Sequence, residues 1–285
     1  MSNGQNPRSP QPTVAAVVLT FNEVADLARA LASLQWCDEL VVVDSGSTDG
    51  TQALAKRWGA RVLEHRQSPP FLITVQRNWA LEKAGIRSDW VLFLDADEQV
   101  GQALAQSIRR TLNEFETSDG YALTPRYWFL GRWLRRTQGY PNWHPRLVRR
   151  GALLLEGGVW ECFPKDARVG HLDEPYEHFA FSKGLDDWLD RHRRYASWEA
   201  ERIVAFRQAG DLQALGTHRW LLLRSLTARF WPLRPALRFA QKYVLQGGWL
   251  EGWQALLFAL LMAGYDLMTV VKVIELRRRS KGLPL

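Results

Sequence analysis

The eight residues from Val91 to Glu98 constrain the fold of this chain more than any other stretch. Val91-Leu92-Phe93-Leu94 is a continuous apolar run, and Asp95-Ala96-Asp97-Glu98 follows it with three carboxylates. A strand that is apolar at every position suits a sheet covered on both faces, and ligands bind beyond the carboxyl ends of such strands. Two aspartates there offer the hard oxygen ligands that Mg²⁺ and Mn²⁺ prefer. The alternative is that the acids cap the next helix, because acidic side chains favour helix N-termini.

The first 115 residues alternate strand-like and helix-like segments. The expected strands are 15–19, 40–43, 61–63 and 90–94, and the expected helices are 23–34, 51–58, 74–84 and 99–115. This order predicts an α/β fold with a mostly parallel sheet flanked by helices. Polar residues follow three of the strands, and they are Thr20 to Glu23, Asp44 to Gly50, and Asp95 to Glu98. We expect these strand ends to converge on one site.

The rest of the chain breaks this rhythm. Residues 116–180 are rich in glycine, proline and aromatic residues, which predicts loops and short strands, and 182–207 has the spacing of an amphipathic helix that ends near Gly210. We therefore expect a disordered tail over 1–12 and a domain over 13–210 with two parts, 13–115 and 116–210. A basic helical region over 211–285 completes the chain.

Composition narrows the class of protein. The chain has 285 residues of which 46% are hydrophobic, enough for a sizeable core. Two cysteines, Cys37 and Cys162, cannot build a disulfide framework or a structural zinc site, and the N-terminus lacks the features of a signal peptide. We expect a reducing, cytoplasmic setting.

The positive charge is concentrated near the C-terminus. Of the net charge of +7, the excess lies in residues 217–285, which hold 11 Lys and Arg against 3 Asp and Glu. These arginines alternate with Leu, Trp and Phe, which favours an anionic membrane surface over nucleic acid as partner. Residues 252–265 are 14 residues without a charge, shorter than the ~20 that a membrane span needs, and Asp266 follows. We expect the stretch from Arg219 to Arg279 to form a helical hairpin in the headgroup layer, in which 252–271 lies in the interface or re-enters the membrane. The alternative is a basic helical subdomain that covers the core.

Several motifs together resemble family 2 glycosyltransferases of the GT-A fold. They are Val17 to Glu23, Val43 to Thr51, Gln76-Arg77-Asn78 and Leu94 to Glu98, and they occur in the family's order and spacing. The stretch 127–195, with Trp160-Glu161 and His178 to Gly184, further resembles the bacterial branch that builds lipopolysaccharide core and exopolysaccharide. That branch often has His-Glu where this chain has Trp160-Glu161.

The resemblance implies an inverting transfer from a nucleotide sugar, most simply a UDP-sugar, to a hydroxyl group. It makes 13–210 the catalytic domain, with 13–115 as the nucleotide-sugar half and 116–210 as the acceptor half. It places Asp44 against the base or ribose and Thr20, Phe21, Glu23 and Ser47 in the same nucleotide pocket, although Ser45 to Gly50 also has the composition of an ordinary strand-to-helix turn. Asp97, with Asp95 beside it, would hold Mn²⁺ or Mg²⁺ against the diphosphate. In the family pattern the second aspartate touches the metal directly, and the first, here Asp95, usually faces the ribose and nucleotide. Arg77 would support the phosphate or the nucleotide pocket, the alternative being a surface salt bridge.

An inverting transfer also needs a base for the acceptor hydroxyl, and the resemblance favours Glu161. Glu156, Asp173 and Glu174 remain alternatives as acids of a solvated surface. Trp160 would stack on a sugar face. Without close His or Cys companions, His144 and His178 are expected to be structural or to contact the acceptor.

Three functions remain open at this point. The first is a glycosyltransferase at the cytoplasmic face of the inner membrane, peripheral or monotopic, whose acceptor is a lipid-linked glycan of the cell envelope. The second uses the same donor but a polyprenyl phosphate acceptor, with a phosphate site among Arg126, Arg132, Arg135 and Arg136. The third is a non-catalytic scaffold that binds sugar nucleotides or membranes. A sugar-nucleotide pyrophosphorylase is disfavoured because no Gly-rich Arg-Thr loop follows the first strand.

Overall fold

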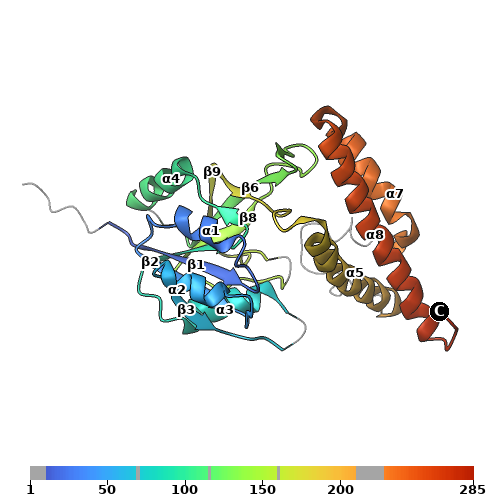
Figure 1. Ribbon diagram of the computed structural model, residues 1–285, viewed down its shortest axis with the longest axis horizontal. Helices are drawn as coiled ribbons and strands as arrows, with labels where there is room; N and C mark the ends of the chain where they lie inside the picture. The colour runs from blue at the N-terminus through green and yellow to red at the C-terminus, as the bar shows by residue number, and fades with distance from the viewer. Residues whose placement is uncertain (1–10, 69–70, 115–116, 159–160, 210–227) are drawn as a thin grey trace, which may run out of the picture. The chain divides into compact units, whose positions relative to one another are not determined.

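The computed structural model describes residues 11–68, 71–114, 117–158, 161–209 and 228–285 (Figure 1). The chain divides into two compact units. The first unit comprises Met1–Pro125 and Asn142–His178, and the second comprises Arg126–Pro141 and Phe179–Leu285. Most of the expected tail, Trp160, Gly210 and the expected boundary between 210 and 211 lie outside the described residues.

The sheet has nine strands and is parallel only in its first part. The four parallel strands are β3 (Arg61–Glu64), β2 (Glu39–Asp44), β1 (Val14–Thr20) and β4 (Trp90–Asp95), hydrogen-bonded in that order. β8 (His144–Arg149) pairs antiparallel with β4 and is followed across the sheet by β6 (Gly120–Phe129), β9 (Val169–His178) and β5 (Glu98–Gln99). β7 (Arg132–Trp133) pairs with β6. The predicted α/β class is confirmed, but the expectation of a mostly parallel sheet needs correction. The sheet is mixed, because residues 116–180 add antiparallel strands beside β4.

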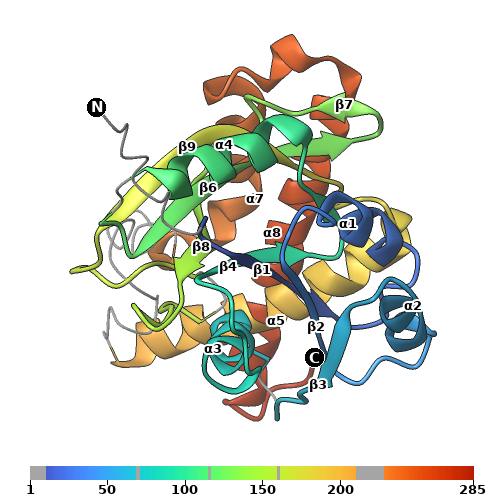
Figure 2. The ribbon, with the colours of Figure 1, turned by 90° about the vertical axis from the view of Figure 1, so that its left-hand side faces the viewer.

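Helices cover both faces of the parallel strands. Successive side chains of a strand point to opposite faces, so Val14, Ala16 and Val18 pack with α1 (Leu27–Ser33), α2 (Thr51–Arg57) and α4 (Gln102–Asn113). Ala15, Val17 and Leu19 pack on the other face with α3 (Ile73–Lys83). Every residue of β1 is buried, and each buried valine or leucine stabilises the fold by about 1.5 to 3 kcal/mol. Figure 2 shows α1 and α2 on one side of β1 and β2, with α3 on the other.

Two sequence expectations need correction. Residues 116–180 contain β6 and β9, each ten residues long, rather than short strands alone. The helix expected over 99–115 begins only at Gln102, because Glu98 and Gln99 pair with His178 and Glu177 of β9. The acids after β4 therefore do not cap a helix.

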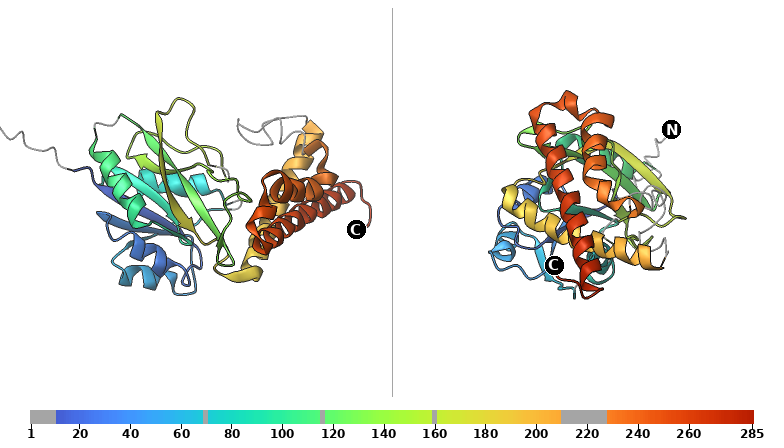
Figure 3. Two further views of the ribbon diagram at one scale, coloured as in Figure 1. Left: turned by 90° about the horizontal axis from the view of Figure 1, so that it is seen from above. Right: turned by 90° about the vertical axis from the view of Figure 1, so that its right-hand side faces the viewer.

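The second unit contains two long helices, α5 (Gly184–Ala209) and α8 (Trp253–Arg279), which pack on each other (Figure 3). Between them in the chain stand η2 (Trp231–Leu233), α7 (Arg234–Phe239), the π-helix η3 (Ala240–Leu245) and η4 (Gly248–Glu251). Apolar packing joins Ala200 and Ile203 of α5 to Val270 and Val273 of α8.

Asp266 of α8 is 1% exposed and paired within this unit. It contacts Arg234 at 2.9 Å and Arg238 at 2.7 Å, and Arg234 also contacts Glu199 of α5 at 2.9 Å. Burial alone would lower the pKa of Arg234, but the charges of Asp266 and Glu199 outweigh it and raise that pKa. Asp266 therefore faces protein.

The uncharged stretch 252–265 is part of a longer element than its composition suggests. Among the described residues, α8 is the one helix whose length and composition would allow it to cross a membrane, and 33% of its most apolar 18-residue window is buried. A long apolar helix that is largely unburied within its own unit has apolar surface left for another partner.

Candidate functional site

The loops after β1 and β2 are joined by hydrogen bonds. The Ser45 amide donates to the Thr20 carbonyl at 2.9 Å, and the Asn22 amide donates to Ser47 Oγ at 2.8 Å. The Glu23 amide donates to Thr51 Oγ1 at 2.8 Å. These bonds hold the polar residues that follow two neighbouring parallel strands at one edge of the sheet, as the sequence predicts.

Asp44 organises this edge. Its buried carboxylate accepts hydrogen bonds from the Thr20 and Ser47 hydroxyls, from the amides of Gly46 and Ser47, and from Gln52 Nε2, at 2.5 to 3.0 Å. Burial alone would raise the pKa of Asp44, but these hydrogen bonds outweigh it and lower that pKa. Gly46 has φ +95, and a Cβ there would meet Arg66 Nε at 2.5 Å, so the turn needs glycine. A nucleotide contact for Asp44, Thr20, Ser47 and Glu23 stays a prediction.

The Phe21 side chain is exposed to solvent at the edge of the sheet. It is 58% exposed directly after β1. An exposed aromatic ring beside an ordered polar loop is available for stacking on a base. The place of Phe21 in the nucleotide pocket, implied by the family resemblance, stays a prediction.

Three consecutive residues of α3 connect three segments of the first unit. Gln76 Nε2 donates to Ser45 Oγ at 3.2 Å, and the Asn78 side chain exchanges hydrogen bonds with the backbone of Leu155. Between them, Arg77 Nη2 contacts Asp95 Oδ1 at 2.8 Å and Nη1 contacts Glu161 Oε1. The alternative of a surface salt bridge for Arg77 is wrong, because its side chain is only 1% exposed, and its support of the phosphate or nucleotide pocket stays a prediction.

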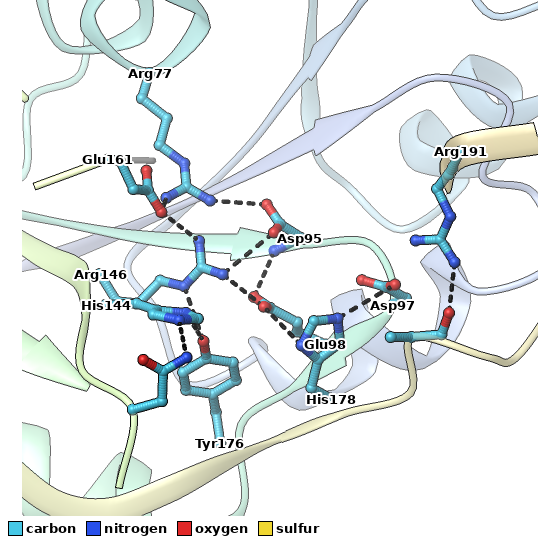
Figure 4. Close-up of polar contacts among 12 residues, drawn as sticks. Arg77, Asp95, Asp97, Glu98, His144, Arg146, Glu161, Tyr176, His178 and Arg191 are labelled. Carbon is cyan, nitrogen blue, oxygen red and sulfur yellow. Dashed lines mark hydrogen bonds and ion pairs between the residues drawn. The ribbon is translucent and has the colours of Figure 1, made fainter. Parts of the chain in front are cut away.

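Arg146 of β8 forms a second bridge among the same acids (Figure 4). Its Nη2 lies 2.6 Å from Glu98 Oε1 and 3.2 Å from Asp95 Oδ2, and its Nη1 lies 3.4 Å from Glu161 Oε1. Burial alone would raise the pKa of Asp95, but the charges of Arg146 and Arg77 hold it well below its usual range. Asp95 and Glu161 are thus held by the same two guanidinium groups.

Glu98 is fully buried beneath Asp95. Its Oε2 accepts a hydrogen bond from the Asp95 amide at 2.9 Å, so it fixes the backbone where β4 ends. Burial raises the pKa of Glu98 to about 7 against the charge of Arg146, and the charge of Asp95 adds to the rise. The low-dielectric surroundings disfavour another negative charge at this place.

His178 at the end of β9 contacts the second aspartate. Its Nε2 lies 3.5 Å from Asp97 Oδ2, and its Nδ1 lies 3.7 Å from Glu98 Oε1 (Figure 4). Burial alone would lower the pKa of His178, but the charge of Asp97 and its hydrogen bond outweigh burial and raise that pKa. His178 therefore joins the site through Asp97.

His144 contacts Tyr176. Its Nδ1 lies 2.8 Å from the buried Tyr176 hydroxyl, and burial with the nearby charge of Arg146 lowers the pKa of His144 to about 3. The two roles expected from the sequence, structural or in contact with the acceptor, stay predictions.

Comparison with known proteins decides the family. The sequence model described as "Glycosyl transferase family 2" matches residues 15–165, which include Asp44, Arg77, Asp95, Asp97 and Glu161. This chain belongs to glycosyl transferase family 2. It is a glycosyltransferase, so the scaffold interpretation does not hold.

Similar proteins agree with this assignment. The lipopolysaccharide core biosynthesis glycosyltransferase LpsC of Rhizobium meliloti (strain 1021) is 27% identical over 96% of this chain and 96% of its own length. An uncharacterized glycosyltransferase of Rickettsia felis is 38% identical over 33% of this chain and 32% of its own length. The solved structure of the mannosyltransferase PcManGT from Pyrobaculum calidifontis, in complex with GDP-Man and Mn²⁺, has a TM-score of 0.50 and 17% identity, covering 94% of this chain and 88% of that one. The GT-A fold expected for this glycosyltransferase is confirmed.

The donor atoms of this glycosyltransferase suit an ion held largely by its substrate. Among the described residues, no group of three or more His, Cys, Asp and Glu side chains could hold a metal ion alone. Both oxygens of Asp95 contact arginines, which leaves Asp97, with His178 beside it, as the nearest ligand. One or two carboxylates combined with substrate phosphates is the usual arrangement for Mg²⁺. The residues therefore fit a divalent ion that arrives with a diphosphate.

Sequence reasoning missed two members of this site, Glu98 as a buried partner and Arg146. The available signal was an arginine next to the apolar pair Leu147-Val148, because a buried arginine requires acidic partners. The acids Asp173 and Glu174 are exposed on β9. Arg126, Arg132, Arg135 and Arg136 belong to the second unit, whereas the two arginines that contact Glu161 are Arg77 and Arg146.

Proposed function

We propose that this glycosyltransferase transfers a sugar with inversion, assisted by Mn²⁺ or Mg²⁺, from a nucleotide sugar, most simply a UDP-sugar, to a hydroxyl of a lipid-linked glycan. The observation that carries the proposal is the Arg77 bridge. One guanidinium contacts Asp95, on the side assigned to the nucleotide sugar, and Glu161, the residue assigned as base. Both halves of the reaction then occupy one rigid cluster.

The charge of the cluster supports a divalent cation. Four carboxylates, of Asp95, Asp97, Glu98 and Glu161, accompany two guanidinium groups and the imidazole of His178, so the cluster carries no net positive charge that would repel a cation. Asp97 would hold a divalent ion beside the diphosphate, where the positive charge of the ion would stabilise the leaving group. The PcManGT structure, which carries GDP-Man and Mn²⁺, is consistent with this assignment.

Glu161 has one oxygen that no hydrogen bond occupies among the described residues. Its Oε1 is held by Arg77 and Arg146, and its Oε2 is buried without a hydrogen-bond partner among the described residues. In the proposed step the acceptor oxygen bonds to the anomeric carbon while the bond from that carbon to the phosphate oxygen breaks. The electron pair leaves with the diphosphate, and the hydroxyl proton passes to Oε2 of Glu161.

The second unit supports an acceptor held at a membrane. Between Phe230 and Trp253, eight large apolar side chains are exposed, and they are Phe230, Leu233, Leu237, Val244, Leu245, Trp249, Leu250 and Trp253. Exposed leucines and tryptophans among arginines suit the headgroup layer of an anionic bilayer. With the likeness to LpsC, this supports cell-envelope polysaccharide synthesis at the cytoplasmic face of the inner membrane, by a peripheral or monotopic enzyme. Exposed Arg132, Arg135 and Arg136 keep polyprenyl phosphate as the second candidate acceptor.

The test is thermal unfolding of the protein with UDP, GDP, CMP and ADP, each with and without Mn²⁺. A ligand that binds only the folded state at a hundred times its Kd stabilises it by about 2.7 kcal/mol. We expect the largest rise in Tm with UDP and Mn²⁺ together, and its loss in Asp97→Asn. Equal rises in Tm for the variant and the wild type would show that Asp97 does not bind the metal. No rise in Tm with any nucleotide would contradict the proposal.

A further inference from the structure

The second unit contains an apolar groove that the proposed chemistry does not use. Its volume is about 640 Å³, in the usual range for small-molecule sites. Its lining residues are Phe129, Leu130, Phe181, Leu185, Trp188, Leu189, Leu257, Leu260, Leu261, Gly264, Tyr265 and Met268. None of these side chains carries a charge.

The groove is long and follows one face of α8. Its residues on this helix recur at intervals of three or four from Leu257 to Met268, which is the spacing of a single helix face. At 1.5 Å per residue that face runs for about 16 Å. Leu185, Trp188 and Leu189 of α5 form another wall with the same spacing. An elongated apolar space suits an extended chain better than a compact planar ligand.

The walls of the groove are not closed over by the described parts of the protein. Leu130, Leu185, Leu257 and Leu260 are each more than 40% exposed. Leaving this much contiguous apolar surface in water is unfavourable, so a ligand that covered it would be bound by the hydrophobic effect. Gly264 helps to keep the space open, because a Cβ there would meet no atom within 4 Å.

A positively charged group stands near one end of the groove. Exposed Arg132 follows Leu130 by two residues, and its Nη1 lies 3.4 Å from the place of a Cβ on Gly252. Gly252 is the N-cap of α8, five residues before Leu257. The groove thus has an apolar body and a basic end, which is the pattern that matches a hydrocarbon chain with an acidic head.

The shape of the groove suits a single chain, because its lining follows one face of α8 on one side and one face of α5 on the other. We propose that it holds one acyl chain of the phosphorylated lipid that anchors the acceptor, with the lipid phosphate at Arg132. This rests on the proposed function, because it gives the lipid-linked acceptor a binding site on the enzyme. Phe181, which lines the groove, is the third residue after His178 in the chain.

The experiment measures binding of dodecyl phosphate, below its micelle concentration, to the full-length protein by isothermal titration calorimetry. Gly264→Phe fills the groove, and Leu267→Phe places the same side chain on α8 at an exposed position that does not line it. We expect Gly264→Phe to weaken binding at least tenfold and Leu267→Phe to change it less than twofold, with the Tm of both within a few degrees of wild type. Arg132→Ala should weaken dodecyl phosphate binding at least fivefold and leave binding of uncharged dodecanol unchanged.

Several results would overturn this inference. No binding of dodecyl phosphate by the wild type, or equal binding by Gly264→Phe, would exclude an acyl chain in the groove. Farnesyl phosphate binding as tightly as dodecyl phosphate would replace the acyl assignment by an isoprenoid one. The Tm shift with UDP and Mn²⁺, measured on the same samples, separates the two proposals. A Tm shift without binding of dodecyl phosphate would contradict only the lipid site in the groove. The absence of the Tm shift would contradict the proposed function.

Discussion

Replacing Arg146 with methionine should destabilise the first unit strongly. The Arg146 side chain is 4% exposed and that of its partner Glu98 is 0% exposed, so the variant removes the nearest cation of a buried carboxylate and leaves only His178, at 3.7 Å, beside it. Removing one partner of a buried ion pair costs about 3 to 5 kcal/mol. Asp95 and Glu161 keep their contacts with Arg77, so their share of the loss should be smaller. For a unit of this size the drop in Tm should be on the order of 10 °C.

The assay is urea unfolding followed by circular dichroism, with Arg168→Met as matched control. Arg168 pairs with Asp119 at 2.8 Å in the same unit, but its side chain is 64% exposed. The control should change the unfolding free energy far less, because exposed ion pairs contribute little. The double variant Arg146→Met with Glu98→Leu should recover most of the loss, because apolar groups can replace a buried pair. A loss of less than about 1 kcal/mol in Arg146→Met, or strict additivity in the double variant, would refute this reasoning.

Three further predictions test other parts of the structure. His178→Ala should weaken the stabilisation by UDP with Mn²⁺, because His178 Nε2 lies 3.5 Å from Asp97; an unchanged Mn²⁺ titration would exclude His178 from the metal site. Arg77→Lys should lower sugar transfer by about 10- to 100-fold, because one ammonium cannot replace a forked contact with two carboxylates; full activity would show that the bridge to Glu161 is dispensable. Burial lowers the pKa of Lys242 to about 8, so the unfolded chain binds a proton that the folded chain releases between pH 8 and 10.5. The unfolding free energy should therefore rise over that window by roughly 3 kcal/mol, and Lys242→Met should lack that rise.

The sequence predicts those parts of the site that local order determines. Asp95 and Asp97 follow a fully apolar strand, and Asp44 follows another, so parallel topology alone brings them to one edge of the sheet. The partners of these residues are set by distant pairing. Glu98 pairs with His178, 80 positions further along the chain, through the short strand β5, and no local pattern marks that contact.

In the C-terminal helices, too, the sequence does not reveal which distant residues become partners. Asp266 interrupts an apolar stretch in the sequence, and placing its carboxylate inside a membrane would cost free energy. In the folded unit Asp266 pairs with Arg234 and Arg238, which stand about thirty positions earlier. Periodicity predicts that α8 is a helix, but only tertiary contacts show which of its polar groups are neutralised by protein.

The most direct test of the account is sugar transfer to lipid-linked glycans in membrane preparations, measured for wild type, Asp97→Asn and Glu161→Gln with radiolabelled nucleotide sugars and Mn²⁺. Nucleotide binding is measured in parallel by the Tm shift. The account predicts that both variants lose transfer by at least a hundredfold, that Glu161→Gln keeps the shift with UDP and Mn²⁺, and that Asp97→Asn loses it. Transfer at the wild-type rate by Glu161→Gln would contradict the assignment of the base, and by Asp97→Asn that of the metal site.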